Sequence, residues 1–127
     1  ANDQLDRKMA EYTQAVVQDR PNFHINIARD ISPNCDCHGE NDAPIIPNIG
    51  MFASFDPVAI DQASVDAALK MEPLPNSQLA DNLAKADFHK HGDHLLDSTP
   101  TSNWEETLIH GEKIGVGTRR YELITIK

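Results

Sequence analysis

Both cysteines of the chain lie in one short segment, Cys35-Asp36-Cys37-His38, and Asp42 follows four residues later. Thiolates, imidazoles and carboxylates are the side chains that bind transition metals. In an extended segment, residues i and i+2 face the same side with Cα atoms about 6.6 Å apart, so a small turn brings two sulfurs onto one ion. This spacing predicts a metal or redox site.

Three interpretations of Cys35 and Cys37 stay open. In the first, the thiolates bind a metal together with His38, Asp42 or a residue brought in by the fold. In the second, they cycle through a disulfide, which so small a ring would strain and make readily reducible. In the third, they are small buried hydrophobic side chains, although a polar loop is an unusual place for that role.

Two carboxylates outside this segment are further candidate ligands. Asp56 directly precedes Pro57 and is predicted to cap the N-terminus of a helix, where its side chain accepts backbone N–H groups. Asp61 shares a stripe with Val65 on an otherwise apolar helix face, so it is either exposed at the edge or buried with a partner. A structural and a functional role stay open for both carboxylates.

A second group of metal-binding side chains comprises His89, His91, Asp93 and His94. It lies in a polar stretch with little pattern of regular structure, which favours solvated surface histidines over a metal site. His24 falls in a predicted strand and is expected to be hydrogen-bonded rather than a ligand.

The composition excludes several classes of partner. The chain has 127 residues, with 20 acidic and 11 basic side chains and a formal net charge of -9. Such a field repels phosphate backbones and anionic lipid, so we expect neither nucleic-acid nor membrane binding. No apolar run approaches the ~20 residues that cross a bilayer. Two cysteines one residue apart make no disulfide framework, which indicates a reducing, cytoplasmic setting.

The first half of the chain predicts one helix and two strands. A helix is expected over about residues 3–18, with its buried face formed by Leu5, Met9, Tyr12 and Val16. A strand should follow at Phe23, with Phe23, Ile25 and Ile27 on its buried face. After a polar loop over residues 30–48, the apolar segment 49–54 is predicted as a strand buried on both sides.

The second half predicts three further helices or helical segments and a last strand. Helices are expected from Asp56 to about residue 71, in a short stretch over 77–88, and from Asn103, with a capping box to Glu106, through about residue 114. Residues 120–126 alternate and should form a closing strand. The expected fold class is α/β, a mixed sheet with helices packed on it, forming one domain over residues 1–127 that is a fragment of a larger domain.

Several of these segments resemble one uncharacterised prokaryotic family, domain-of-unknown-function family 362. The similarity covers roughly residues 5–70 and 103–126. It is carried by Ile31-Ser-Pro-Asn-Cys-Asp-Cys37, Asp42-Ala-Pro-Ile-Ile-Pro-Asn-Ile-Gly50, Ala53-Ser-Phe-Asp-Pro-Val-Ala-Ile-Asp-Gln-Ala63 and Ile114-Gly-Val-Gly-Thr-Arg-Arg-Tyr-Glu-Leu-Ile124. The family usually has aspartate where Asn48 stands. The histidine stretch lies outside the resemblance.

The resemblance implies an iron–sulfur context. Proteins of this family often carry a ferredoxin-like module with two [4Fe–4S] clusters ahead of the segment that corresponds to residue 1. The cluster runs of spaced cysteines are absent from this sequence. We therefore expect the C-terminal part of a longer protein, with the clusters in an upstream module. The resemblance also implies that Cys35, Cys37, Asp56 and Asp61 belong to one site, because all four lie in matching segments.

The first functional hypothesis is a metal-binding domain of an iron–sulfur redox protein. Cys35 and Cys37 would be ligands, and Asp61 or Asp56 with His38 would complete the shell around a divalent ion. Zinc fits this donor set better than iron. The partner would be the ferredoxin-like module of the same polypeptide or another electron-transfer protein.

Two rival hypotheses come from other classes of protein. The chain could be a non-catalytic scaffold that docks a ferredoxin module, or an enzyme whose pocket uses Asp56 and Asp61 without a metal. The reaction, and whether the chain is an enzyme at all, stay open. So does the oligomeric state, where an exposed apolar interface would allow a dimer.

Overall fold

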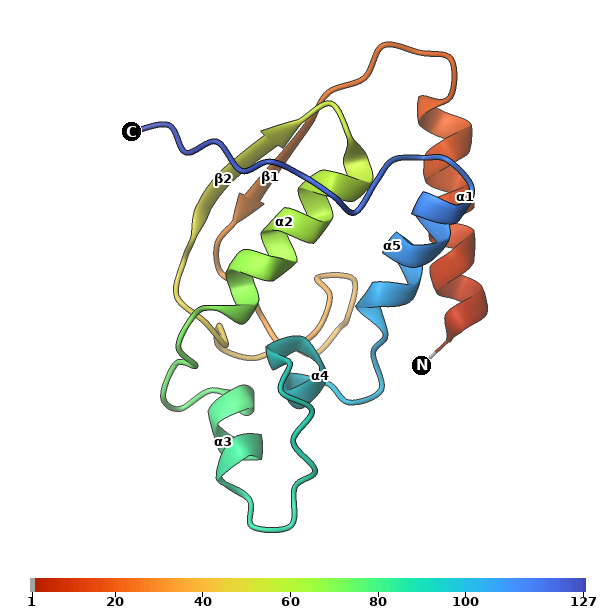
Figure 1. Cartoon of the computed structure of the whole chain (residues 1–127). Helices are drawn as coiled ribbons and strands as arrows, with labels where there is room; N and C mark the ends of the chain where they lie inside the picture. The colour runs from red at the N-terminus through yellow and green to blue at the C-terminus, as the bar shows by residue number, and fades with distance from the viewer. Residues whose placement is uncertain (1) are drawn as a thin grey trace. The chain divides into compact units, whose positions relative to one another are not determined.

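The computed structural model describes residues 2–127, which contain five helices and one two-stranded sheet (Figure 1). The arrows of the two strands run in opposite directions, so the sheet is antiparallel. This combination confirms the α/β class. The elements in chain order are α1 (Asp3–Val17), β1 (His24–Ala28), β2 (Gly50–Ser54), α2 (Pro57–Leu69), α3 (Gln78–Ala84), α4 (His94–Ser98) and α5 (Trp104–Lys113).

The described chain divides into two compact units. The first unit combines the residues up to Ile27 with Met51–Asp66 and Asn103–Lys127. The second unit combines Ala28–Gly50 with Ala67–Ser102. No helix among residues 2–127 is long and apolar enough to cross a bilayer.

In the first unit, α1 and α5 lie side by side and are joined by a ladder of polar contacts. The ladder consists of Asn103 Nδ2 with Asp3 Oδ1 at 2.8 Å, Arg7 Nε with Glu106 Oε1 at 2.5 Å, His110 Nε2 with Glu11 Oε1 at 3.2 Å, and Gln14 Nε2 with the Ile114 carbonyl at 2.8 Å. From one contact to the next the residue numbers increase on both helices, so the two helices run parallel. At Gly111 the two helices also meet α2, since an added Cβ there would lie 3.1 Å from Val58 Cγ2 and 3.8 Å from Ala10 Cβ.

The apolar stripe of α1 is exposed, contrary to its prediction as the buried face. Its members are between 53% and 72% exposed: Leu5, Met9, Tyr12 and Val16. The polar stripe faces α5 instead, and Ala10 is the buried residue of the helix. The 3.6-residue period predicted the helix correctly, but the contacts that orient it are the long-range polar pairs with α5.

In β1, too, the face that was predicted to be buried is the exposed one. The side chains of Ile25 and Ile27 are 56% and 65% exposed, whereas Asn26 between them turns toward α2. The Asn26 amide donates to Asp61 Oδ1 at 2.8 Å and to Ser64 Oγ at 3.1 Å. These two hydrogen bonds fix which face of β1 meets the helix, and they place the isoleucines on the open side.

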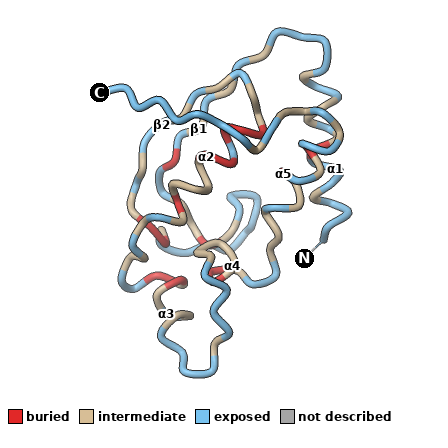
Figure 2. The backbone as a smooth tube through the Cα atoms, in the orientation of Figure 1, coloured by how far each residue is buried: buried red, intermediate tan, exposed pale blue. Residues whose placement is uncertain are grey.

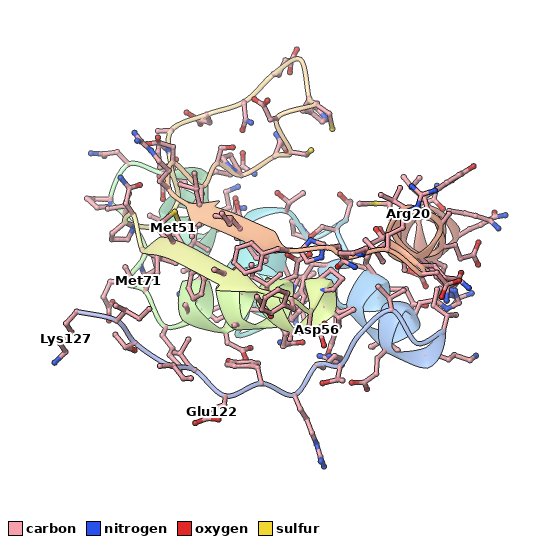
Figure 3. All side chains as sticks on the ribbon, turned by 90° about the horizontal axis from the view of Figure 1, so that it is seen from above. Arg20, Met51, Asp56, Met71, Glu122 and Lys127 are labelled. Carbon is pink, nitrogen blue, oxygen red and sulfur yellow. The ribbon has the colours of Figure 1, made fainter. Side chains whose placement is uncertain are left out.

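On β2, the prediction of burial on both sides is also wrong. Met51 is 70% exposed (Figure 3), and Phe55 just beyond the strand is 79% exposed. The ring of Phe55 contacts that of Phe23 edge to face, with centroids 5.0 Å apart. We call the resulting surface the apolar sheet face, and it comprises Phe23, Ile25, Ile27, Met51 and Phe55.

The second unit has its own small core. Ile45 and Ile46 are 1% exposed and Leu79 is fully buried, and they cluster with Ala68. Figure 2 colours the buried stretches of the backbone red. The Ile45 N–H donates to the carbonyl of Ile31 at 2.8 Å, which closes the long loop between β1 and β2. A loop that contains no helix or strand is thus anchored by two buried isoleucines.

The helix starts follow the capping rules unevenly. Asp56 caps α2 as predicted, because its Oδ1 accepts the N–H groups of Val58 and Ala59, both at 2.9 Å. Asn103 makes no side-chain cap bond to α5, so the predicted capping box is wrong. Its amide donates to α1 instead. The short helix α4, absent from the sequence prediction, is capped by Asp93.

Residues 120–126 form no strand, which corrects the prediction of a closing strand. Side chains, rather than backbone pairing, hold the preceding residues to α2. Thr118 N donates to Asp56 Oδ2 at 2.9 Å, and Arg119 Nε donates to Gln62 Oε1 at 2.8 Å. We call residues 117–127 the C-terminal segment.

Tyr121 ties this segment to α2 and carries a pH-dependent contribution to stability. Its hydroxyl donates to Asp66 Oδ2 at 2.6 Å, and this bond with burial and the carboxylate charge raises the pKa of Tyr121 to about 12. Because the unfolded value is about 10, the contribution is complete below pH ~10 and is lost as pH rises through the folded pKa. In a Tyr12→Phe background, absorbance titration should show Asp66→Asn lowering the pKa of Tyr121 toward 10. An unchanged titration would contradict the contact.

Candidate functional site

The cysteine segment is shaped by a turn and one asparagine. The His38 N–H donates to the Cys35 carbonyl at 2.8 Å, which closes the turn around the two thiols. Asn41 then ties the loop together, as its amide donates to Ser32 Oγ at 3.0 Å and to the Asn34 carbonyl at 2.9 Å. Asn41 was not singled out from the sequence, although asparagine is typical of such loops because its side chain bonds nearby backbone.

The two thiols are exposed, free and turned toward each other. The Cys37 thiol hydrogen-bonds the Cys35 sulfur, and this bond holds the pKa of Cys35 below its ordinary value. The same bond raises the pKa of Cys37, whose proton it holds. Both shifts arise mainly from the partner thiol, so the two sulfurs lie close enough to interact.

His38 follows this pair in the chain, and its side chain is exposed. Its Nδ1 lies 3.2 Å from the Glu40 carbonyl oxygen. A carbonyl only accepts, so Nδ1 carries a hydrogen, and in the neutral ring Nε2 carries the lone pair. A metal-binding histidine usually has its other nitrogen engaged in this way. Among residues 2–127, however, no three histidine, cysteine or carboxylate side chains converge on one point.

The two candidate carboxylates lie in the first unit: Asp56 directly precedes α2 (Figure 3), and Asp61 lies within that helix. Asp56 accepts three backbone N–H groups, from Val58, Ala59 and Thr118. Asp61 is exposed and accepts the Asn26 amide. A carboxylate with one hydrogen bond and water around it is freer to serve a ligand than one that satisfies a helix start.

The predicted site residues thus fall into two groups. Cys35, Cys37 and His38 belong to the second unit, whereas Asp56 and Asp61 belong to the first. Within each group the residues are close together in the chain. That the two groups form a single site stays a prediction.

A cavity of about 620 Å³ lies elsewhere in the first unit. The turn after α1, the start of α2 and the Gly115-Val116 bend line it, and Arg20 is among its residues. Neither Asp56 nor Asp61 lines this cavity. It therefore lends no support to a carboxylate pocket of the kind expected for a metal-free enzyme.

The thiol pair is the arrangement with the most definite chemistry. Two converging sulfurs with one depressed pKa suit a soft or borderline cation such as Zn²⁺, which binds thiolates and not thiols. They also suit thiol–disulfide exchange, which begins with the more acidic thiol. Hard oxygen-seeking ions such as Mg²⁺ and Ca²⁺ do not prefer this donor set.

The pKa difference predicts the order of alkylation. At a pH below the ordinary cysteine value, iodoacetamide should modify Cys35 faster than Cys37, because only thiolates react. Cys37→Ala removes the hydrogen-bond donor, so it should raise the pKa of Cys35 and slow its alkylation at neutral pH. Peptide mass spectrometry over a pH series measures both rates. Equal rates at the two thiols would contradict the hydrogen bond.

A family model described as Domain of unknown function (DUF362) matches residues 1–66 of the chain. The match is just over half of the 127 residues, and it includes both cysteines, His38 and the two aspartates. No curated protein and no solved structure matches the chain.

Proposed function

Because the chain belongs to the DUF362 family, whose function is unknown, we propose from its site that it is a metal-binding domain of an iron–sulfur redox protein. Cys35 and Cys37 are its metal-binding thiols. The observation that carries this proposal is the pair of free, exposed thiols one residue apart in one loop, whose interaction shifts their pKa values in opposite directions. Sulfurs that already converge need little rearrangement to share one ion, and a depressed pKa lowers the cost of releasing the first proton.

The donor set favours zinc over iron. Two thiolates and the Nε2 lone pair of His38 are ligands that Zn²⁺ prefers. Asp56 is the less available of the two candidate carboxylates, because ligation there would cost the N-terminal cap of α2. A zinc ion with a closed shell would be structural, whereas one with an open position would act as a Lewis acid.

The iron–sulfur part of the proposal concerns the partner. We propose that two [4Fe–4S] clusters lie in a ferredoxin-like module of the same polypeptide, outside residues 1–127. This chain would then be the C-terminal part of that polypeptide. The thiol pair would then lie in a protein that transfers electrons. This step rests on what the family resemblance implies.

Cobalt substitution tests the proposal directly. Co²⁺ bound by thiolates gives an intense sulfur-to-metal charge-transfer band in the near ultraviolet, which oxygen and nitrogen ligands do not give. Titration of the wild type should develop this band, and Cys37→Ser should abolish it. Asp36→Ser is the matched control, because it alters the residue between the thiols and leaves both sulfurs in place. No band in the wild type would reject the thiol site.

The exposed apolar surfaces of the first unit favour a second candidate function, a non-catalytic scaffold. The apolar sheet face has members between 54% and 79% exposed, and the α1 stripe adds four more apolar side chains. Contiguous apolar patches of this kind mark interaction sites. Under this proposal the ferredoxin-like module docks on the apolar sheet face.

Substitutions on the sheet face separate the two candidates. Ile25→Lys with Met51→Lys should abolish association with a ferredoxin that carries two [4Fe–4S] clusters, measured by sedimentation velocity. The Cys35→Ser and Cys37→Ser double variant should leave that association unchanged. Retained binding after both lysine substitutions would reject the docking face, and self-association lost with them would identify a dimer interface instead.

A further inference from the structure

Asp97 is a buried carboxylate that holds His91 in place. Asp97 is 3% exposed. Its Oδ1 accepts the backbone N–H of His91 at 2.6 Å and the ring Nδ1–H of His91 at 2.9 Å. Asp97 is itself fixed in α4, where its N–H donates to the Asp93 carbonyl at 2.7 Å. A buried carboxylate needs such partners, because burial without them is costly.

This contact decides which nitrogen of His91 is available. The carboxylate accepts from Nδ1–H, so in the neutral ring Nε2 carries the lone pair. The His91 side chain is 30% exposed, which leaves part of the ring accessible to a ligand from solvent. A carboxylate behind one ring nitrogen fixes the orientation of the ring, as it does for histidines that bind metals.

The ring of His89 lies next to that of His91. Their centroids are 5.1 Å apart and their planes cross at 88°. Two imidazoles that share one tetrahedral ion have centroids about 5 Å apart, because each metal–nitrogen bond is about 2.0–2.1 Å and the ring centre lies roughly 1.1 Å further on. The observed centroid separation therefore falls in the range that a shared tetrahedral ion requires.

We propose that His89 and His91 form a second divalent-metal site, with Asp97 as the residue that positions His91. Imidazole pairs favour Zn²⁺ and other late transition metals over Mg²⁺ or Ca²⁺. No third side-chain ligand joins them among residues 2–127, so water completes the shell. His94 is not a ligand through Nε2, because that nitrogen donates to the Met71 carbonyl at 2.7 Å. The site lies beyond the matched residues 1–66.

Calorimetric titration with Zn²⁺ tests this site in a Cys35→Ser, Cys37→Ser background, which removes the thiols. The background should bind one equivalent. His89→Ala and His91→Ala should each weaken binding at least tenfold, and Asp97→Asn should weaken it by about 10- to 100-fold, as losses behind a ligand typically do. His24→Ala is the control, because His24 is engaged with Asn22 in the first unit and should leave the affinity unchanged.

A spectroscopic measurement separates positioning from folding. The ¹⁵N spectrum of the His91 ring should show the Nδ1–H tautomer in the wild type and a mixture of tautomers in Asp97→Asn. If Asp97→Asn unfolds the chain, His89→Ala decides, since His89 is exposed and its loss should spare the thermal melt. Absence of zinc binding in the background, or equal affinity in His89→Ala, would overturn the proposal.

Discussion

Gly117→Ala should lower the free energy of unfolding by about 2–4 kcal/mol, a large loss for one methyl group. A Cβ at this position would overlap the Asp56 carboxylate and lie 2.7 Å from its Cγ. The carboxylate would have to move away, and its bonds to the N–H groups of Val58, Ala59 and Thr118 would weaken together. The helix cap and the anchor of the C-terminal segment would be lost in one step.

Two comparisons isolate this cause. Gly39→Ala is the control, because an added Cβ there has no neighbour within 4 Å, and its effect should stay within about 0.5 kcal/mol. In an Asp56→Ala background the oxygens are gone, so Gly117→Ala should cost little further. Urea denaturation of the four variants and the wild type measures the coupling. An undiminished loss in the Asp56→Ala background would show that the clash lies elsewhere.

Cys35→Ser should reduce zinc affinity by about 100-fold or more, because one of roughly four ligands to a structural zinc contributes about 3 kcal/mol. Both thiols are exposed and neither packs in the core of the second unit. The free energy of unfolding without metal should therefore change by less than about 0.5 kcal/mol. Ligand loss and destabilisation are thus separable at this position.

The measurement is competition with a chromophoric chelator, in a His89→Ala, His91→Ala background that removes the second proposed site. Asp36→Ser again supplies the matched control and should keep the affinity of the background. A Cys35→Ser variant that binds zinc as tightly as Asp36→Ser would contradict thiolate ligation. A large loss of stability in the metal-free variant would instead assign Cys35 a structural role.

Local patterns predicted most of the helices and strands. The cap at Asp56 and the apolar period of residues 3–18 depend on neighbours a few residues away, and α1 and α2 follow them closely. The proximity of Cys35 and Cys37 is local in the same sense, whereas their convergence on one ion stays a prediction. The cap of α4 had a readable signal as well, because Asp93 stands two residues before the pair Leu95-Leu96.

Long-range partners decided what could not be predicted. The period of β1 identified two alternating faces, but the bond from Asn26 to Asp61, 35 residues away, selected the polar one for the helix. The predicted closing strand does not form, because side-chain contacts hold this segment instead, such as that of Tyr121 with Asp66, 55 residues away. The pairing of His91 with Asp97 depends on α4, and this helix was not predicted because the sequence around it is polar and shows little periodicity.

The most direct test of the thiol site is the metal content of the chain, measured by elemental analysis after purification without chelator. The His89→Ala, His91→Ala protein should be compared with the same protein that also carries Cys35→Ser. We predict about one zinc or iron per chain in the former and none in the latter. No metal in either protein, with both thiols freely alkylated in the wild type, would contradict a metal site at Cys35 and Cys37.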